Sequence, residues 1–340
     1  MSDLTYPFPE PPAQGEMITI APGIHWLQMP LPMALDHINL YILDDGDDFW
    51  IVDTGMKWGE MHSIWESVFA GPLAGRKCVG VICTHMHPDH IGMAGWLCEK
   101  WRVPFYMSYG EYYQARAFMN MTADDLSWTS EEYYIRQGMS DEYIADVRKK
   151  FVGFKAYCEN MPGAFRRLKE GDALYIGNRG WQVKIGRGHS PEHVCLYSAS
   201  DKVLLSGDQI IPRITSNISL NSVEPGANPL GQWFKSLRRF LSLPMDTLVC
   251  PSHNMPFYGI RHRLQYLIRH HEEHLCNLEE ACASGEPSCH ELLPVLFKRP
   301  IGPHDMGLAL GECAAHLNYL TFAGRLAREL AVNQHGSTGA

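Results

Sequence analysis

The sequence lacks the features that mark membrane and secreted proteins. No apolar run in the 340 residues approaches the roughly 18 uninterrupted residues of a transmembrane helix. Residues Met1 to Pro7 show no basic region followed by an apolar core, so no secretory signal is expected. The ten cysteines form no CxxC pair, and Cys83, Cys195 and Cys250 fall in apolar segments, which favours buried free thiols. These absences predict a cytoplasmic protein with no membrane partner.

Positive charge is also scarce. The chain has 29 Lys and Arg residues against 38 Asp and Glu residues, a formal net charge of -9, and no basic block. A protein that binds a phosphate backbone gains affinity by releasing counterions through Lys and Arg, so a nucleic acid partner is not expected. With 45% hydrophobic residues the chain can bury a large core. We therefore expect one large domain with an appendage.

The most informative segment is Thr84-His85-Met86-His87-Pro88-Asp89-His90. It lies between an apolar, strand-like stretch, Cys78 to Cys83, and a segment that predicts the start of a helix, Ile91 to Leu97. Three imidazoles and a carboxylate at the end of a strand are typical of a metal site. A single His beside a strand is more often an ordinary polar residue, so the prediction depends on the joint pattern.

Further candidate ligands follow other predicted strands. His189 comes after Trp181 to Ile185, Asp208 after Lys202 to Leu205, and His253 after Thr247 to Cys250. These motifs, in this order, resemble the metallo-β-lactamase superfamily, and the early Asp53-Thr54-Gly55 turn matches it too. The resemblance covers about residues 17 to 260 and implies an α+β fold, a four-layer αββα sandwich. It implies one metal held by His85, His87 and His189, a second held by Asp89, His90 and His253, and Asp208 bridging both.

The implied cofactors are two zinc ions, with iron or manganese as alternatives, because imidazole and carboxylate ligands suit all three. Two cations that share a water lower its pKa and polarise the electrophilic oxygen of the substrate. The expected nucleophile is therefore a metal-bridging hydroxide, with Asp89 and Asp208 as the catalytic carboxylates. Asp53 is expected to brace the ligands through hydrogen bonds without touching metal.

The resemblance allows several reactions. We expect hydrolysis of a carbonyl ester, thioester or lactone of a small, partly apolar substrate, similar to the glyoxalase II and lactonase branches. A phosphodiesterase or endoribonuclease of the same superfamily is the alternative, which the net charge disfavours. A β-lactamase is less favoured because those branches are usually exported, and a non-catalytic binding protein is disfavoured by the complete ligand set.

The predicted organisation is a loosely held N-terminal arm (1–16), a catalytic domain (17–260) and a C-terminal helical domain (261–340). Short strands at 17–20, 25–28, 37–43 and 49–52 predict an antiparallel opening sheet. A helical, aromatic-rich insertion at about 110–169, with Ser130 and Ser140 as helix N-caps, is expected to form either a lid over the metals or simple packing. Tentative substrate contacts are Tyr112, Tyr133 and Arg213, with packing and a surface salt bridge as the alternatives.

The C-terminal region predicts helices. Leu264, Ile268, Leu275, Leu278 and Cys282 form a helical apolar stripe. Within it, the run 270–274 (HHEEH) does not fit the HExxH zinc motif, so a solvated helix face is the preferred interpretation. The tail resembles a small winged-helix appendage of one branch of the superfamily. Its balanced local charge favours packing or a homodimer contact over DNA binding.

Overall fold

The structure is a computed structural model that describes residues 4–33, 35–303 and 305–329. The chain folds into two compact units, each built from separated segments. Unit 1 comprises Met1–Met121, Gly153–Ser216 and Arg238–Leu264, and unit 2 comprises Thr122–Val152, Asn217–Leu237 and Gln265–Ala340. The linear division at residues 16/17 and 260/261 stays a prediction. No helix among the described residues has the length and apolar character needed to cross a membrane.

Unit 1 contains a seven-stranded sheet in the order β1-β2-β3-β4-β5-β6-β7. Neighbours from β1 to β4 are antiparallel, and those from β4 to β7 are parallel. The predicted antiparallel opening is therefore confirmed. The strands are β1 (Met17–Ala21), β2 (Ile24–Pro30), β3 (His37–Asp45), β4 (Asp48–Val52), β5 (Cys78–Ile82), β6 (Phe105–Ser108) and β7 (Arg166–Leu168).

A second sheet of unit 1 has the order β12-β11-β10-β9-β8. Neighbours from β8 to β11 are antiparallel, whereas β11 and β12 are parallel. Its strands are β8 (Ala173–Ile176), β9 (Arg179–Gly186), β10 (His193–Ser198), β11 (Val203–Gly207) and β12 (Leu248–Pro251). Strands β9, β11 and β12 therefore end at the same edge of the sheet.

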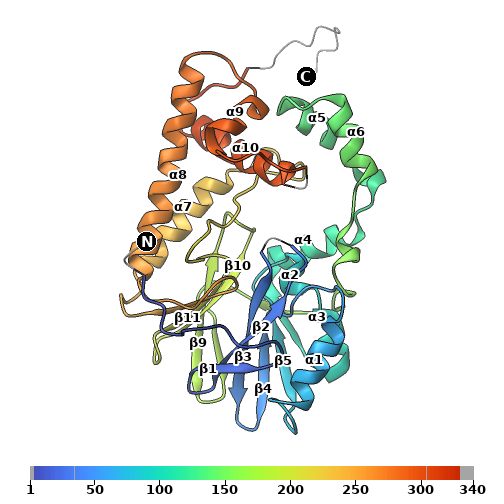
Figure 1. Ribbon diagram of the computed structural model, residues 1–340, viewed down its shortest axis with the longest axis vertical. Helices are drawn as coiled ribbons and strands as arrows, with labels where there is room; N and C mark the ends of the chain where they lie inside the picture. The colour runs from blue at the N-terminus through green and yellow to red at the C-terminus, as the bar shows by residue number, and fades with distance from the viewer. Residues whose placement is uncertain (1–3, 34, 304, 330–340) are drawn as a thin grey trace. The chain divides into compact units, whose positions relative to one another are not determined.

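The first sheet is buried on both faces. Successive side chains of a strand point to opposite sides of the sheet, so neighbouring residues of β2 reach different cores. Trp26 of β2 packs in a core with Trp181 of the second sheet, so the two sheets lie face to face. Leu27, the next residue, belongs to the opposite core, which also contains Trp65 of α1 and Leu97 of α3. Figure 1 shows these helices beside the first sheet. The helices of unit 1 are α1 (Met61–Ala70), α2 (Pro88–Ile91), α3 (Ala94–Trp101), α4 (Tyr109–Asn120) and the short 3-10 turn η2 (Phe154–Ala156).

The remaining helices belong wholly or mostly to unit 2. They are η1 (Ala123–Asp125), α5 (Trp128–Arg136), α6 (Asp141–Lys149), α7 (Pro229–Phe240), α8 (Ile260–Ala283), α9 (Cys289–Leu296) and α10 (Met306–Phe322). The expected insertion is thus helical, but α4 lies in unit 1 and both α5 and α6 in unit 2. Ser140 caps α6 by accepting a hydrogen bond from Tyr143 N–H, as predicted. Ser130 lies inside α5, whose N-cap residue is Ser127, so that N-cap prediction is wrong.

Three expectations outside the metal centre differ from the structure. Thr5 exchanges two backbone hydrogen bonds with Tyr258, and the Phe8 ring packs on Trp26, so this part of the arm is held against unit 1. His271 was expected on a solvated face, but its side chain is fully buried. After α8 the described residues form α9 and α10 and no strand, so the winged-helix resemblance is not confirmed.

Candidate metal centre

The candidate ligands meet because the strands that precede them end close together. His85 follows β5, Asp208 directly follows β11, and His253 follows β12. His189 follows β9, which runs in the same direction as β11 and β12. The loops at the carboxyl ends of these strands therefore present their side chains to one another. Sites formed from loops on a rigid sheet scaffold are common in enzymes.

The first group of candidate ligands consists of His85, His87, His189 and Asp208. One ligand atom from each lies within 4.8 Å of the others. Nε2 of His85 lies 2.8 Å from Nδ1 of His87 and 3.2 Å from Nε2 of His189. Such a convergence of imidazole nitrogens is suited to a divalent transition metal.

The second group consists of Asp89, His90 and His253, again within 4.8 Å. Asp89 and His90 lie on the short helix α2, which begins with Pro88 at its first position. Oδ2 of Asp89 lies 3.3 Å from Nε2 of His253 and 3.5 Å from Nε2 of His90. The two groups contain all seven candidate ligands of the sequence analysis, and metal binding by these residues stays a prediction.

Asp208 faces both groups. Its Oδ2 lies 3.5 Å from Nε2 of His189 in the first group. Its Oδ1 lies 3.4 Å from Nε2 of His253 and 3.6 Å from Nε2 of His90 in the second. One carboxylate oxygen is thus directed to each side, the arrangement that a bridging ligand requires.

Asp53 forms hydrogen bonds that hold His90, a member of the second group. Its Oδ1 accepts a hydrogen bond from Thr84 N–H at 2.7 Å, and its Oδ2 accepts from Thr84 Oγ1 at 2.9 Å and from Nδ1 of His90 at 2.8 Å. Asp53 has a φ of 60°, a left-handed conformation that Asp tolerates better than most residues. This turn directs the carboxylate at His90.

The hydrogen-bond partners of His90 and His253 indicate that a cation fits the second group. Nδ1 of His90 donates to Asp53, and Nδ1 of His253 lies 2.8 Å from the carbonyl oxygen of His37, which can only accept. In the neutral imidazoles both Nε2 atoms therefore present lone pairs to the oxygens of Asp89 and Asp208. Nε2 of His90 and Oδ1 of Asp208 are buried and have no hydrogen-bond partner among the described residues. A divalent cation between these atoms would satisfy them all.

The electrostatics of the two groups differ. Burial disfavours the charged imidazole of His253, but the carboxylates of Asp208 and Asp89 raise its pKa to about 10. Burial, and then the neighbouring His189, lower the pKa of His87 to about 3. The field at the second group favours positive charge, so a metal ion there replaces protons.

A family model for the metallo-beta-lactamase superfamily matches residues 34–253, the segment that holds every candidate ligand. The chain belongs to the metallo-beta-lactamase superfamily. A second model, described as metallo-beta-lactamase-like, C-terminal domain, matches residues 275–335. The C-terminal helices therefore also have a counterpart within this superfamily.

Similar proteins agree with this membership. The crystal structure of a beta-lactamase domain protein from Burkholderia ambifaria is 41% identical, with a TM-score of 0.89, and the match covers 96% of this chain and 95% of that one. Probable metallo-hydrolase YqjP of Bacillus subtilis is 23% identical over 306 residues, which are 86% of this chain and 91% of that protein. Human acyl-coenzyme A thioesterase MBLAC2 is 23% identical over 201 residues, which are 56% of this chain and 65% of that protein. The α+β metallo-β-lactamase fold and the metal-dependent hydrolase class are confirmed.

Two residues of this superfamily member connect the ligand loops and were missed by the sequence analysis. Glu111 of α4 is fully buried and accepts hydrogen bonds from Met86 N–H at 3.0 Å, Ser190 Oγ at 2.6 Å and Glu192 N–H at 2.7 Å. It thereby joins the loop of His85 and His87 to the loop of His189. Burial outweighs these hydrogen bonds and raises the pKa of Glu111 to about 7.

His193 of β10 is the second missed residue. Its ring stacks on His85 with centroids 4.6 Å apart, and its Nε2 accepts a hydrogen bond from Asp208 N–H at 3.0 Å. Gly207 leaves space for this ring, because a Cβ at residue 207 would lie 2.4 Å from it. A signal was present in the sequence, since His193 begins an apolar strand four residues after His189.

The three tentative substrate contacts lie in different surroundings. Tyr112 is buried, donates to Pro162 O at 2.9 Å and stacks on Phe165. Tyr133, in unit 2, is buried and donates to Leu220 O at 2.8 Å. Arg213 is exposed and lies over the ring of Tyr6. The contacts of both tyrosines are those of packing residues, and substrate binding by any of the three stays a prediction.

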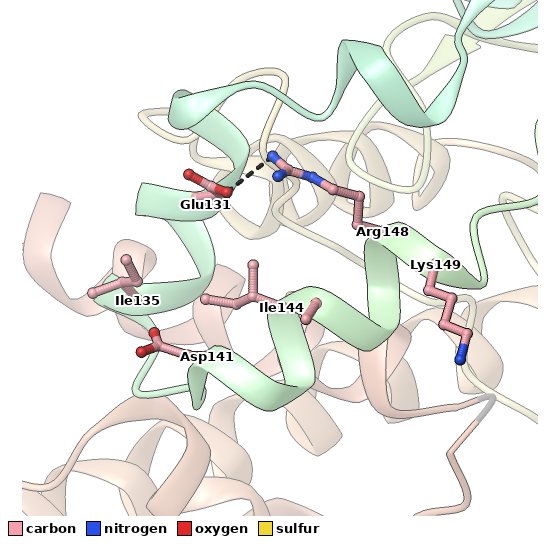
Figure 2. Close-up of a pocket in the computed structure, with 7 residues that line it drawn as sticks. Glu131, Ile135, Asp141, Ile144, Arg148 and Lys149 are labelled. Carbon is pink, nitrogen blue, oxygen red and sulfur yellow. Dashed lines mark ion pairs between the residues drawn. The ribbon is translucent and has the colours of Figure 1, made fainter.

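A surface hollow of about 510 Å³ lies between α5 and α6 in unit 2 (Figure 2). Glu131 and Arg148 form an ion pair of 2.9 Å on its lining. No candidate metal ligand lines it, so this hollow does not belong to the metal centre. Its lining residues are Glu131, Ile135, Asp141, Ile144, Ala145, Arg148 and Lys149.

Proposed function

We propose that this chain hydrolyses carbonyl thioesters, esters or lactones of small, partly apolar substrates. The observation that carries the proposal is Asp208, whose two carboxylate oxygens face two separate ligand groups. Support for the carbonyl class comes from the human relative named as an acyl-coenzyme A thioesterase. The net charge of -9 and the lack of a basic block argue against a nucleic acid as the phosphodiester substrate, because binding along a phosphate backbone relies on many Lys and Arg side chains.

The side chains of the centre suggest a division of roles. When bound, two divalent ions supply a water of lowered pKa and polarise the substrate oxygen. Asp89 is more accessible than Asp208, with 17% of its side chain exposed against 10%. We infer that the carboxylate of Asp89 would orient the attacking water, accept its proton and pass that proton to the leaving group. We infer zinc as the default ion, since five of the seven ligands are imidazoles.

Aromatic recognition of the substrate is assigned to α4. The exposed aromatic side chains of this helix are Tyr109 and Tyr113, each about half exposed, with ring centroids 4.6 Å apart. Their helix begins at the loop of His189, because Gly110 N–H donates to the Glu192 carboxylate at 2.9 Å. Exposed aromatic rings on a helix that begins at a ligand loop suit contact with an apolar acyl group.

The test is thiol release from acyl-CoA and acyl-glutathione thioesters of increasing acyl length. We expect release by zinc-loaded protein and its loss after chelation, with kcat/KM rising with acyl length. Replacing Tyr109 and Tyr113 together by Ala should flatten that rise, whereas Tyr175→Ala, at an 80% exposed position on β8, should not. Equal kcat/KM across the series would contradict the assignment of the rings.

Assays on the same protein sample distinguish carbonyl substrates from phosphodiesters. Release of p-nitrophenol from a phosphodiester, with none from thioesters, esters or lactones, would replace the proposal by the phosphodiesterase alternative. Zinc content must be measured alongside, because inactivity of a metal-free sample has no bearing on the substrate.

A further inference from the structure

A third group of imidazoles lies in unit 2, away in sequence from the metal centre. His271 and His274 lie on α8 three residues apart, a spacing that places them on one face of a helix. His316 lies on α10. One nitrogen from each ring lies within 4.8 Å of the other two.

Hydrogen bonds fix the state of one ring. Nδ1 of His316 lies 2.7 Å from the carbonyl oxygen of Glu312, so this nitrogen donates and Nε2 carries the lone pair. That lone pair faces Nδ1 of His271 at 3.0 Å. His316 is therefore oriented by its own helix to present a ligand atom to α8, as metal-binding imidazoles commonly are.

Hydrogen bonding within the group leaves polar atoms without partners. Nε2 of His271 and Nδ1 of His274 are buried and have no hydrogen-bond partner among the described residues. His271 and His316 are fully buried and His274 is half-buried. A cation held by Nδ1 of His274 and by Nδ1 of His271, the nitrogen that faces His316, would give the buried Nδ1 of His274 the partner it lacks.

The rings are also in the protonation state that binds metal. Burial, with the neighbouring His270, lowers the pKa of His274 to about 3, and burial lowers the pKa of His316 to about 4. Burial likewise lowers the pKa of His271. Neutral imidazoles keep one lone pair each, which is the form that ligates a cation.

We propose that His271, His274 and His316 bind one transition-metal cation that ties α8 to α10. An all-imidazole set suits zinc, nickel, cobalt or copper and does not suit magnesium or calcium, which prefer oxygen. Water reaching the half-buried His274 would supply a fourth ligand. The site is built from unit 2 alone and does not depend on the proposed reaction.

The experiment compares zinc stoichiometry in full-length variants. Metal is removed from each protein with a chelator, and the protein is reloaded with excess zinc. After unbound metal has been removed, the zinc content per chain is measured by elemental mass spectrometry. We expect His274→Ala to hold one zinc ion fewer per chain than the wild type while keeping its hydrolytic activity. His290→Ala, which removes an exposed imidazole of unit 2 outside the group, should match the wild type.

Equal zinc content in wild type and His274→Ala would overturn the proposal, and the group would then be a hydrogen-bonded imidazole cluster. If His274→Ala fails to fold, crystals of wild-type protein loaded with zinc provide the test through anomalous scattering at the zinc edge. A peak between the three rings is expected, and its absence would also overturn the proposal.

Discussion

Nδ1 of His90 donates a hydrogen bond to Oδ2 of Asp53 across 2.8 Å, and both side chains are buried. This contact fixes the tautomer of His90, because a carboxylate can only accept. In the neutral imidazole Nε2 is then the nitrogen with the lone pair, and it is directed at the oxygens of Asp89 and Asp208. The orientation of a candidate ligand thus depends on a residue 37 positions earlier in the chain.

Asp53→Asn should weaken metal binding at the second group by about 10- to 100-fold. The Asn side chain keeps the left-handed backbone but can offer an N–H to Nδ1 of His90, which moves the ring proton to Nε2 and blocks the lone pair. Chelator competition followed by zinc analysis measures the change. Asp246→Asn, at an exposed carboxylate, is the control, and equal affinities in both variants would show that Asp53 has no such role.

Asp89→Ala should lose nearly all turnover, a fall of at least about 100-fold in kcat. The first group of ligands, His85, His87 and His189, is unchanged, so this variant should still bind zinc there. Steady-state kinetics with parallel zinc analysis tests both parts. Unchanged turnover in a zinc-containing Asp89→Ala protein would contradict the role assigned to this carboxylate.

Gly207→Ala should destabilise the fold by about 1–3 kcal/mol and lower metal content. A Cβ at this residue would lie 2.4 Å from the His193 ring, and Gly207 has a φ of 52°. The displaced ring would disturb both His85 and the backbone of Asp208. Denaturant unfolding with zinc analysis measures the effect. Gly163→Ala is the matched control, since no atom lies within 4 Å of its added Cβ, and it should be neutral.

Glu312→Gln should remove a pH dependence of stability. Burial raises the pKa of Glu312 to about 7, although the hydrogen bond from Asn217 opposes the shift. A raised pKa means that the folded chain keeps its proton longer than the unfolded chain. Wild-type stability should therefore fall as pH rises from about 4.5 through about 7, by about 3 kcal/mol at most.

The Gln side chain has no proton to lose and can still accept from Asn217. Thermal unfolding at pH 5 and pH 8 should therefore show the variant gaining relative to wild type at the higher pH. A difference between the two proteins that is the same at both pH values would contradict the assigned titration.

The candidate ligands could be predicted because all of them follow one of four apolar strands that the sequence marks clearly. The contacts of Glu111 could not, because its partners Ser190 and Glu192 lie about 80 residues later and only the folded sheets bring them near. Tyr112 and Tyr113 illustrate a similar limit. Helical periodicity does not decide which of two adjacent tyrosines is buried until the neighbouring layer is known.

The burial of His271 had a signal in the sequence. The apolar stripe of α8 includes Leu264, Ile268, Leu275 and Leu278, and His271 occupies the helical position between Ile268 and Leu275. Charged neighbours at residues 272 and 273 favoured a solvated interpretation of the whole run. Assigning each residue to a face of the helix separates His271 from residues 272 and 273. The contact with His316 of α10 could not be predicted in this way, because it depends on tertiary packing.

The position of Asp208 between two ligand groups has a consequence for how metal enters the centre. A first bound ion would take up part of the negative charge of this carboxylate and fix its orientation, which would change the binding free energy of a second ion. Loading of the two sites would therefore be coupled, and by thermodynamic linkage each ion would alter the affinity of the other by the same factor. A titration of this centre should follow a cooperative isotherm, positive or negative, in place of two independent ones.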